Sequence, residues 1–328
     1  MRLGLSSFVF RYAVGAPVGE PMDAFTLLRR AYAYGLDAVQ FSDNLPLHLM
    51  GESEHAALRN LAGDLGVGIE VGTRGMDHQL LRSYVALAAF YGSHALRLVL
   101  DEPDSGRAES ELRWLLPLLE EHRLPLAIEN HGEMPAAELE ALVQRIGHPL
   151  LGFCVDTANN LVLLERPMET MAPLAGRATQ LHLKDYVVQR SPVGYRITGC
   201  PLGEGALDLR ATIRLIRPLE REMDVFLECW MDPAHRGLRH CSRRSAGSPG
   251  AWRAPRPCLA ARQKMTLSWI LAVIPPDHEA FGCLVAEADA TAVATYSIAT
   301  VSHAGDPDTM EPFALIRCTT NLPRRRYI

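Results

Sequence analysis

The sequence predicts a closed (β/α)8 barrel, the TIM-barrel fold, for about the first 230 residues. Short apolar runs alternate with longer segments of helical period, and each run ends in polar residues or glycine. Runs that are apolar throughout indicate parallel strands buried on both faces, and eight such units favour closure into a barrel. The strand-like runs cover residues 3–10, 38–44, 68–75, 95–103, 126–132, 151–160, 180–186 and 225–232.

Segments of helical period lie between these runs. In residues 23–35, Phe25, Leu28 and Ala31 recur at helical spacing, and Gly35 predicts the end of the helix. Further helices are predicted at residues 76–92, 105–123, 134–147 and 206–221. A doubly wound open sheet is the alternative fold, which we disfavour because no G-x-G-x-x-G motif follows the first strand.

The composition changes after Asp232. Residues 233–262 contain no Asp or Glu and are rich in Arg, Pro, Ser and Ala, so they form a helix poorly where a barrel needs its eighth. We therefore predict a barrel domain at 1–232 and an atypical C-terminal extension at 233–328, with the eighth helix atypical or absent. A disordered extension, a frame-shifted chain and a basic tail that binds an anionic partner all stay open.

Charge and cysteine usage exclude several classes of protein. The net charge of −5 offers no basic surface for nucleic acid. The seven cysteines include no C-x-x-C pair, which favours reduced thiols in the cytoplasm. No signal peptide and no apolar run of about 20 residues is present, so we expect neither export nor a membrane partner. A homo-oligomer is left open.

Four strand ends supply candidate metal ligands. Glu129 follows the fifth apolar run, Asp156 the sixth, His182 the seventh and Glu228 the eighth. Neighbouring parallel strands lie about 4.8 Å apart, so these side chains converge at one end of the barrel. Three carboxylates together repel one another unless a cation compensates. One nitrogen and several hard oxygens suit Mn²⁺, Mg²⁺ or Co²⁺. Taken alone, each of these residues is more often an ordinary rim or packing residue.

These segments resemble a known family. "AIENHG" (127–132), "CVDTANN" (154–160), "QLHLKDY" (180–186) with "GCPLGEGALDL" (199–209), and "FLECW" (226–230) are similar to the xylose isomerase-like TIM-barrel superfamily of the sugar phosphate isomerase/epimerase type. The resemblance covers about residues 1–232. It implies one divalent metal held by Glu129, Asp156, His182 and Glu228.

The resemblance also implies a function. We expect a metal-dependent sugar isomerase or epimerase that moves a proton through a metal-stabilised enediolate, with a small sugar or polyol as substrate. Glu129 and Glu228 are the expected acid/base pair. Lys184 would hold a substrate oxygen or the developing charge, unless it is a solvated lysine. His131, Asn159 and Arg97 are further candidates for substrate binding.

Two departures from the family pattern narrow this expectation. Asn159 stands where many relatives carry the histidine of a D-x-x-H motif, and Val188 stands where ketohexose 3-epimerases carry an arginine. A 3-epimerase of free ketohexoses is thus disfavoured. So is a zinc endonuclease of the endonuclease IV type, which needs extra histidines. An inosose-type dehydratase and an inactive barrel that acts as a binding protein are the alternatives.

Overall fold

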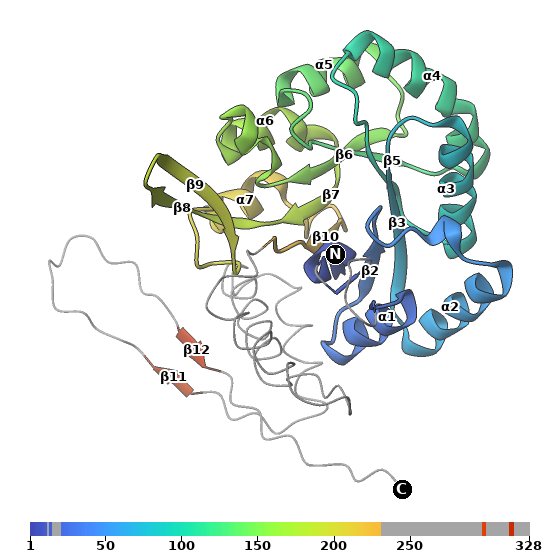
Figure 1. The fold of residues 1–328 in the computed structure, drawn as a ribbon, viewed down its shortest axis with the longest axis horizontal. Helices are drawn as coiled ribbons and strands as arrows, with labels where there is room; N and C mark the ends of the chain where they lie inside the picture. The colour runs from blue at the N-terminus through green and yellow to red at the C-terminus, as the bar shows by residue number, and fades with distance from the viewer. Residues whose placement is uncertain (12, 15–20, 231–296, 300–314, 318–328) are drawn as a thin grey trace, which may run out of the picture. The chain divides into compact units, whose positions relative to one another are not determined.

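The computed structural model describes residues 1–11, 13–14, 21–230, 297–299 and 315–317. Eight parallel strands close into a barrel in the order β1-β10-β7-β6-β5-β4-β3-β2 (Figure 1). The predicted (β/α)8 barrel is confirmed. Its strands are β1 (Arg2–Ser6), β2 (Ala38–Phe41), β3 (Gly68–Arg74), β4 (Leu96–Val99), β5 (Leu126–Glu129), β6 (Leu151–Asp156), β7 (Ala178–Leu183) and β10 (Asp224–Leu227).

Helices follow the strands and surround the barrel (Figure 1). Several begin at an aspartate whose side chain accepts a backbone N–H of the first turn, at Asp23, Asp77, Asp104 and Asp208. The described α-helices are α1 (Ala24–Ala33), α2 (Glu52–Leu65), α3 (His78–Tyr91), α4 (Ser105–His122), α5 (Ala136–Ile146), α6 (Pro167–Leu174) and α7 (Leu209–Ile216). Short 3₁₀ turns are η1 (Ser7–Phe10), η2 (Leu47–Leu49), η3 (Asn159–Leu163) and η4 (Ala175–Arg177).

All five helices that we expected from the sequence are present, with one correction to a buried face. In α1 the residues that pack inward are Ala24, Leu27, Leu28 and Ala31. Phe25, which we expected in this face, is only partly buried. Phe25 has helical spacing from Leu28 and Ala31, but the buried face of α1 is centred on Leu27 and Leu28.

A hairpin that the sequence did not predict lies between β7 and α7. It pairs β8 (Asp185–Ser191) with β9 (Gly194–Cys200) in antiparallel register. Asp185 anchors the loop after it by accepting backbone N–H groups of Gly203 and Gly205, both at 2.9 Å, and of Leu207 at 3.0 Å. The HLKD motif and the glycine-rich loop are therefore two parts of one local structure.

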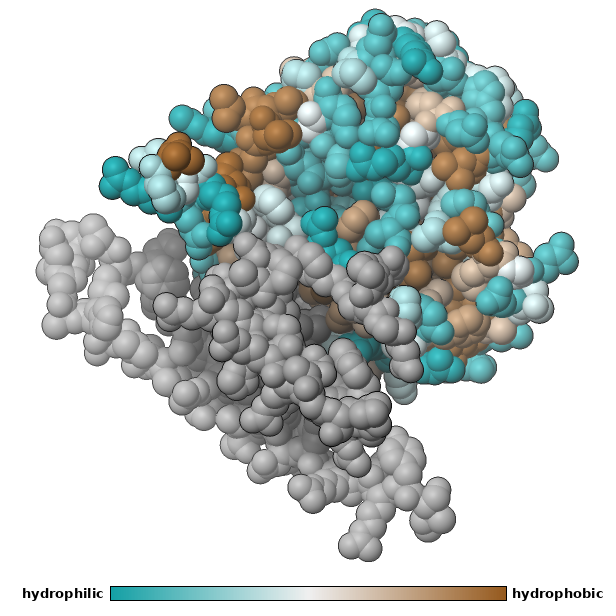
Figure 2. Space-filling model, in the orientation of Figure 1, coloured by the Kyte–Doolittle hydropathy of each residue, from teal (hydrophilic) through white to brown (hydrophobic). Residues whose placement is uncertain are grey.

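Apolar side chains gather on the surface near α6 and the hairpin (Figure 2). Among the described residues, Leu164 is 89% exposed in the turn before α6, and Val193 is 98% exposed at the hairpin tip. Elsewhere on the helical ring in this view, hydrophilic side chains alternate with further apolar patches (Figure 2).

The chain separates into two compact units, residues 1–263 and 264–328. In the second unit the structure describes one antiparallel pair, β11 (Ser297–Ala299) and β12 (Leu315–Arg317). The predicted domain boundary, the eighth helix and the rest of the extension lie outside the described residues and stay predictions. Within the described ranges, no helix combines the length and hydropathy required to span a bilayer.

Glycines let the barrel strands approach closely below the polar end. A Cβ on Gly4 would lie 2.6 Å from the backbone oxygen of Ala38 and equally close to the ring of Phe226. A Cβ on Gly72 would lie 2.8 Å from Cδ of Arg97. Only glycine fits at these two points, and the space at Gly72 admits the long side chain of Arg97 into the barrel interior.

Candidate metal centre

Four side chains meet at the C-terminal ends of consecutive strands. Glu129 ends β5, Asp156 ends β6, His182 lies near the end of β7, and Glu228 directly follows β10. Each offers one ligand atom, and these atoms lie within 4.8 Å of one another. Asp156 pairs with His182 in the register of β6 and β7, so the backbone itself sets their proximity. The structure therefore brings together all four residues predicted as metal ligands.

The distances centre on the imidazole of His182. Its Nδ1 atom lies 2.6 Å from Oε2 of Glu228, 3.5 Å from Oε2 of Glu129 and 3.9 Å from Oδ2 of Asp156. All four residues are at least 97% buried. Within the described part of the chain, Asp156 Oδ2, His182 Nδ1 and Glu228 Oε2 make no hydrogen bond of good geometry, although Lys184 is ion-paired with Asp156 and the His182 ring lies against Glu228. Buried polar atoms that converge without well-formed hydrogen bonds are costly, so their convergence favours a shared ligand.

A divalent cation fits this arrangement. Metal–ligand bonds of about 2.1 Å place neighbouring ligands of an octahedral ion about 3 Å apart and opposite ligands about 4 Å apart. The distances of 2.6, 3.5 and 3.9 Å from Nδ1 cover that range. One imidazole and three carboxylates suit a hard cation better than a thiolate-bound structural zinc.

Lys184 and Asn159 border the cluster. The ammonium of Lys184 lies 2.9 Å from Oδ2 of Asp156 and 3.5 Å from Oε2 of Glu228, and it donates to Oδ1 of Asn159 at 2.9 Å. Asn159 in turn donates from Nδ2 to Oε1 of Glu129 at 2.8 Å. Between them, the two residues contact Glu129, Asp156 and Glu228. Their predicted contact with substrate stays a prediction.

Arg97 is buried inside the barrel beneath this end. Its Nε atom donates to Oε2 of Glu129, and its Nη1 donates to Oδ1 of Asp43 at 2.9 Å. The side chain is 1% exposed. This environment supports a role in holding Glu129, whereas the predicted role of Arg97 in binding substrate stays a prediction.

The surrounding charges keep both glutamates ionised. Burial is the largest single effect and would raise the pKa of Glu129, but the charges of Arg97, His182 and Lys184 together outweigh it and lower the pKa. Burial also opposes ionisation of Glu228, whose pKa nevertheless lies well below its usual range because Lys184 and His182 are close. Both side chains are therefore ionised and ready to bind a cation, and both are poor proton donors.

The remaining groups hold protons more tightly than usual. Burial raises the pKa of Asp156, although Lys184 opposes this. Burial alone would lower the pKa of His182, whereas Cys154, Glu228 and Glu129 raise it well above its usual value. Burial likewise opposes the charge on Lys184, but the carboxylates raise its pKa. Lys184 therefore stays protonated beside the two ionised glutamates.

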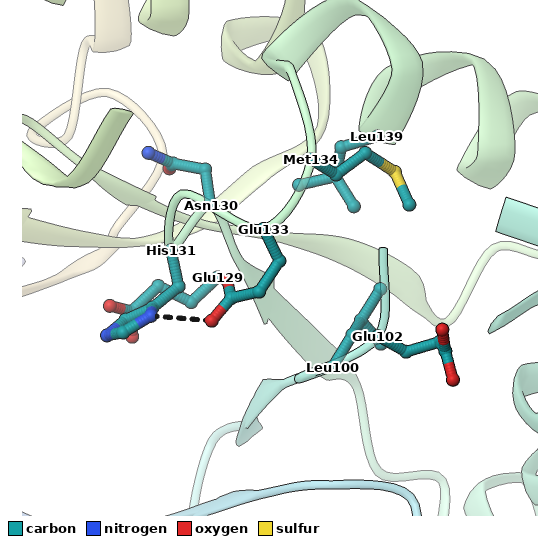
Figure 3. A pocket seen from close by; sticks show the side chains of 8 residues that line it. All are labelled: Leu100, Glu102, Glu129, Asn130, His131, Glu133, Met134 and Leu139. Carbon is teal, nitrogen blue, oxygen red and sulfur yellow. Dashed lines mark hydrogen bonds and ion pairs between the residues drawn. The ribbon is translucent and has the colours of Figure 1, made fainter. Parts of the chain in front are cut away.

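His131 lies at the rim of the site rather than among the ligands. It lines a small hollow beside Glu129, together with Glu133 and Met134 (Figure 3). Its Nδ1 atom lies 3.0 Å from Oε1 of Glu133, the contact drawn as a dashed line in Figure 3. Nη2 of Arg74 lies 2.9 Å from its Nε2. His131 is half-exposed, so its predicted contact with substrate stays open.

Polar residues of the earlier strands divide between the two ends of the barrel. Arg74 lies at the ligand end and pairs with Asp101 at 3.0 Å. Glu70 lies at the opposite end, where it pairs with Arg2 and accepts the backbone N–H of His94 at 3.0 Å. Of these, Arg74 is near the candidate site, whereas Glu70 is too deep to meet a sugar directly.

Sequence reasoning missed two buried side chains beside the site. Gln40 accepts from Nε2 of His182 at 2.8 Å, and Cys154 lies on the barrel interior next to Glu129 and His182. The alternation of side chains along each strand could have indicated both residues. Gln40 is a polar residue in an otherwise apolar strand, and Cys154 lies two residues before Asp156 and so points to the same side of its strand.

The fold and the site together define a (β/α)8 barrel with a carboxylate–imidazole cluster suited to one divalent cation. A family model described as "Xylose isomerase-like TIM barrel" matches residues 77–245. The 3-oxo-isoapionate decarboxylase of Pectobacterium atrosepticum is 31% identical over 237 residues, which cover 70% of this chain and 86% of the decarboxylase. The chain belongs to the xylose isomerase-like TIM-barrel family.

Solved structures support the fold. A xylose isomerase-like TIM-barrel protein from Mycobacterium smegmatis in complex with magnesium has a TM-score of 0.61 at 17% identity, covering 84% of this chain and 98% of that one. D-psicose 3-epimerase from Clostridium cellulolyticum, with D-tagatose, has a TM-score of 0.60 at 13% identity, covering 82% and 98%. At these identities the likeness concerns the fold. The relatives thus include a decarboxylase and an epimerase, and the expected isomerase class is not confirmed.

Proposed function

We propose that the chain is a divalent-metal-dependent enzyme that removes CO₂ from a small hydroxylated 3-oxo acid. The observation that carries a metal-dependent reaction is the convergence of three buried ligand atoms that make no well-formed hydrogen bond, Asp156 Oδ2, His182 Nδ1 and Glu228 Oε2. The decarboxylase that is 31% identical over 86% of its own length supports the reaction class. Glu129, Asp156, His182 and Glu228 are the proposed ligands, and Mn²⁺, Mg²⁺ or Co²⁺ the proposed ion.

When bound, the cation would polarise the ketone oxygen and offset the negative charge that develops on it. Arg97 and Asn159 each donate to one oxygen of Glu129 and so hold it in place. Breaking the C–C bond leaves its electron pair on the carbon next to the ketone, with the charge delocalised onto the ketone oxygen. That carbon then needs one proton.

Lys184 is the proposed proton donor. Its ammonium lies at the cluster, and it is protonated where both glutamates are ionised. A divalent cation close by would lower the pKa of the ammonium and make the proton easier to transfer. Nζ of Lys184 would give this proton to the carbon that has lost CO₂ and regain one from solvent.

The expected sugar isomerase or epimerase is the second candidate. The position of the ionised Glu228 at the cluster favours it, because a carboxylate there can reach a proton on carbon. The strongly lowered pKa of Glu228 makes it a weak base in the metal-free site. Epimerisation also needs a second proton carrier on the other face, and both oxygens of Glu129 already accept hydrogen bonds. An inosose-type dehydratase would share the proton removal and then expel water.

The test uses the full chain with Mn²⁺ in D₂O. With 3-oxo-isoapionate we expect CO₂ and a ketone one carbon shorter that carries one new deuterium, and we expect EDTA to abolish both. Deuterium exchange into ketoses without CO₂ would instead establish the isomerase, and loss of water the dehydratase. A chain that takes up no divalent ion and is not stabilised thermally by Mn²⁺ would rule out all three in favour of a binding protein.

A further inference from the structure

Three buried polar side chains inside the barrel have no part in the proposed chemistry. They are Gln40 on β2, Glu70 on β3 and Gln180 on β7, each no more than 1% exposed. A polar group buried this deeply is costly unless it is hydrogen-bonded, and these three bond to one another. Together they link the metal-ligand end of the barrel to its opposite end.

The bonds form one chain from His182 to Glu70. Nε2 of His182 lies 2.8 Å from Oε1 of Gln40. Nε2 of Gln40 donates to Oε1 of Gln180 at 3.1 Å, and Nε2 of Gln180 donates to Oε2 of Glu70 at 3.5 Å. Each amide thus accepts through its oxygen and donates through its nitrogen.

Glu70 sets the direction of this chain. Its Oε1 accepts from Nη2 of Arg2 and from the backbone N–H of His94, and its Oε2 from the backbone N–H of Ala95 as well as from Gln180. Burial raises the pKa of Glu70 to about 7, although Arg2 and the backbone N–H of His94 lower it. With four donors aimed at its two oxygens, the ionised Glu70 accepts from Gln180, and this form sets the direction of the chain.

The reverse arrangement is excluded by the same contacts. Turning the amide of Gln40 alone would oppose its oxygen to the oxygen of Gln180. Turning both amides would oppose the oxygen of Gln180 to the carboxylate of Glu70. Gln40 must therefore present its oxygen to His182, so Nε2 of His182 carries a proton and the lone pair of Nδ1 is the one available at the metal centre.

We propose that Gln40, Gln180 and Glu70 are positioning residues that fix the tautomer and ring orientation of His182 for metal binding through Nδ1. The inference rests on the metal centre proposed above and extends it to residues at the far end of the barrel. An outer partner of a ligating histidine typically changes metal affinity by about 10-fold to 100-fold when it is removed.

The first test measures Mn²⁺ affinity of the full chain by calorimetry. We expect Gln40→Leu to bind Mn²⁺ 10-fold to 100-fold more weakly, and Gln180→Leu to weaken binding to a smaller extent. The matched control is Thr212→Val. It removes a hydrogen bond from the hydroxyl of another buried residue, Thr212, to the backbone oxygen of Asp208, and it should leave the affinity unchanged. Circular dichroism confirms that each variant folds.

The second test needs no substitution of Gln40, Gln180 or Glu70. In the Zn²⁺-loaded wild type with ¹⁵N-labelled histidine, the His182 ring, assigned with His182→Gln, should show a protonated Nε2 and a metal-bound Nδ1. Metal bound through Nε2, or folded Gln40→Leu with wild-type Mn²⁺ affinity, would overturn the inference. If the wild type binds no divalent ion at all, the proposed function itself fails, so the two failures are distinct.

Discussion

The guanidinium of Arg97 is ion-paired with the carboxylate of Glu129 inside the barrel, and both side chains are closed off from solvent. Neither charge has water to stabilise it, so each depends on the other. Gly72 makes room for this pair, because a Cβ there would collide with Arg97. The ion pair therefore couples the packing of β3 and β4 to the first proposed metal ligand.

Replacing Arg97 with methionine should destabilise the metal-free protein by about 3–5 kcal/mol, because it leaves a buried carboxylate without its partner. Mn²⁺ should recover part of this loss, since it supplies positive charge to the same carboxylates. Urea unfolding with EDTA and with Mn²⁺ measures both effects.

The matched control for that substitution is Arg113→Met, which removes an exposed ion pair with Glu109 on α4. Exposed pairs of this kind contribute little to stability, and among the described residues no contact joins this one to the metal centre. Equal stability losses in the two variants, or an Arg97→Met protein indifferent to Mn²⁺, would contradict the coupling of Arg97 to the site.

Divalent-metal affinity should fall as the pH falls. The pKa of His182 lies well above its usual value in the metal-free site, so the ring is protonated at neutral pH. Binding through Nδ1 must release that proton, which predicts about tenfold weaker Mn²⁺ binding for each pH unit lost. The raised pKa of Asp156 adds to the same trend in acid.

Calorimetry at pH 6, 7 and 8, in two buffers of different ionisation enthalpy, counts the released protons. His148→Gln alters a histidine just before β6, at the other end of the barrel, and should keep the slope. An affinity independent of pH would mean that His182 is not protonated in the empty site or is not a ligand.

Loss of the Lys184 ammonium should tighten metal binding and slow the reaction. An ammonium and a divalent ion a few ångströms apart repel by about 1.5 kcal/mol even at the dielectric of water, so Lys184→Met should bind Mn²⁺ roughly tenfold more tightly. Release and protonation of product should slow by about 100-fold or more, because the proton donor is gone. Mn²⁺ calorimetry and CO₂ release follow the two effects separately.

Lys184→Arg separates charge from proton transfer at the same position. It keeps the positive charge, so its Mn²⁺ affinity should stay close to that of the wild type. It should remain as slow as Lys184→Met, because a guanidinium holds its proton too tightly to donate. Full activity in the arginine variant would show that Lys184 acts only through charge.

The strand ends made the candidate site predictable from the sequence. Each of Glu129, Asp156, His182 and Glu228 follows an apolar run, and parallel strands must deliver such residues to one end of a barrel. The clustering that the structure shows follows from this register, in which Asp156 pairs with His182. The same reasoning could not tell a metal ligand from a residue that positions one, because both lie at strand positions whose side chains point into the barrel.

The role of Gln40 and the β8–β9 hairpin depend on contacts between distant segments. Gln40 and His182 are 142 positions apart, and no local pattern links them. Asp185 belongs to the HLKD motif, but its hydrogen-bond partners are the backbone N–H groups of Gly203 and Gly205, which follow the β8–β9 hairpin. Arg97 was placed at the correct strand, but its pairing with Glu129 follows from the space left by Gly72.

Two glycine substitutions should change stability in opposite directions. Gly4→Ala places a Cβ 2.6 Å from the backbone oxygen of Ala38, which cannot move without disturbing β2, so we expect a loss of about 2 kcal/mol or more. Gly63→Ala, at an exposed position in the last turn of α2, meets no atom within 4 Å and should gain about 0.5–1 kcal/mol. Thermal and urea unfolding of both variants decide this. Stabilisation by Gly4→Ala would show that the strands of the barrel do not approach as closely there as Ala38 and Phe226 indicate.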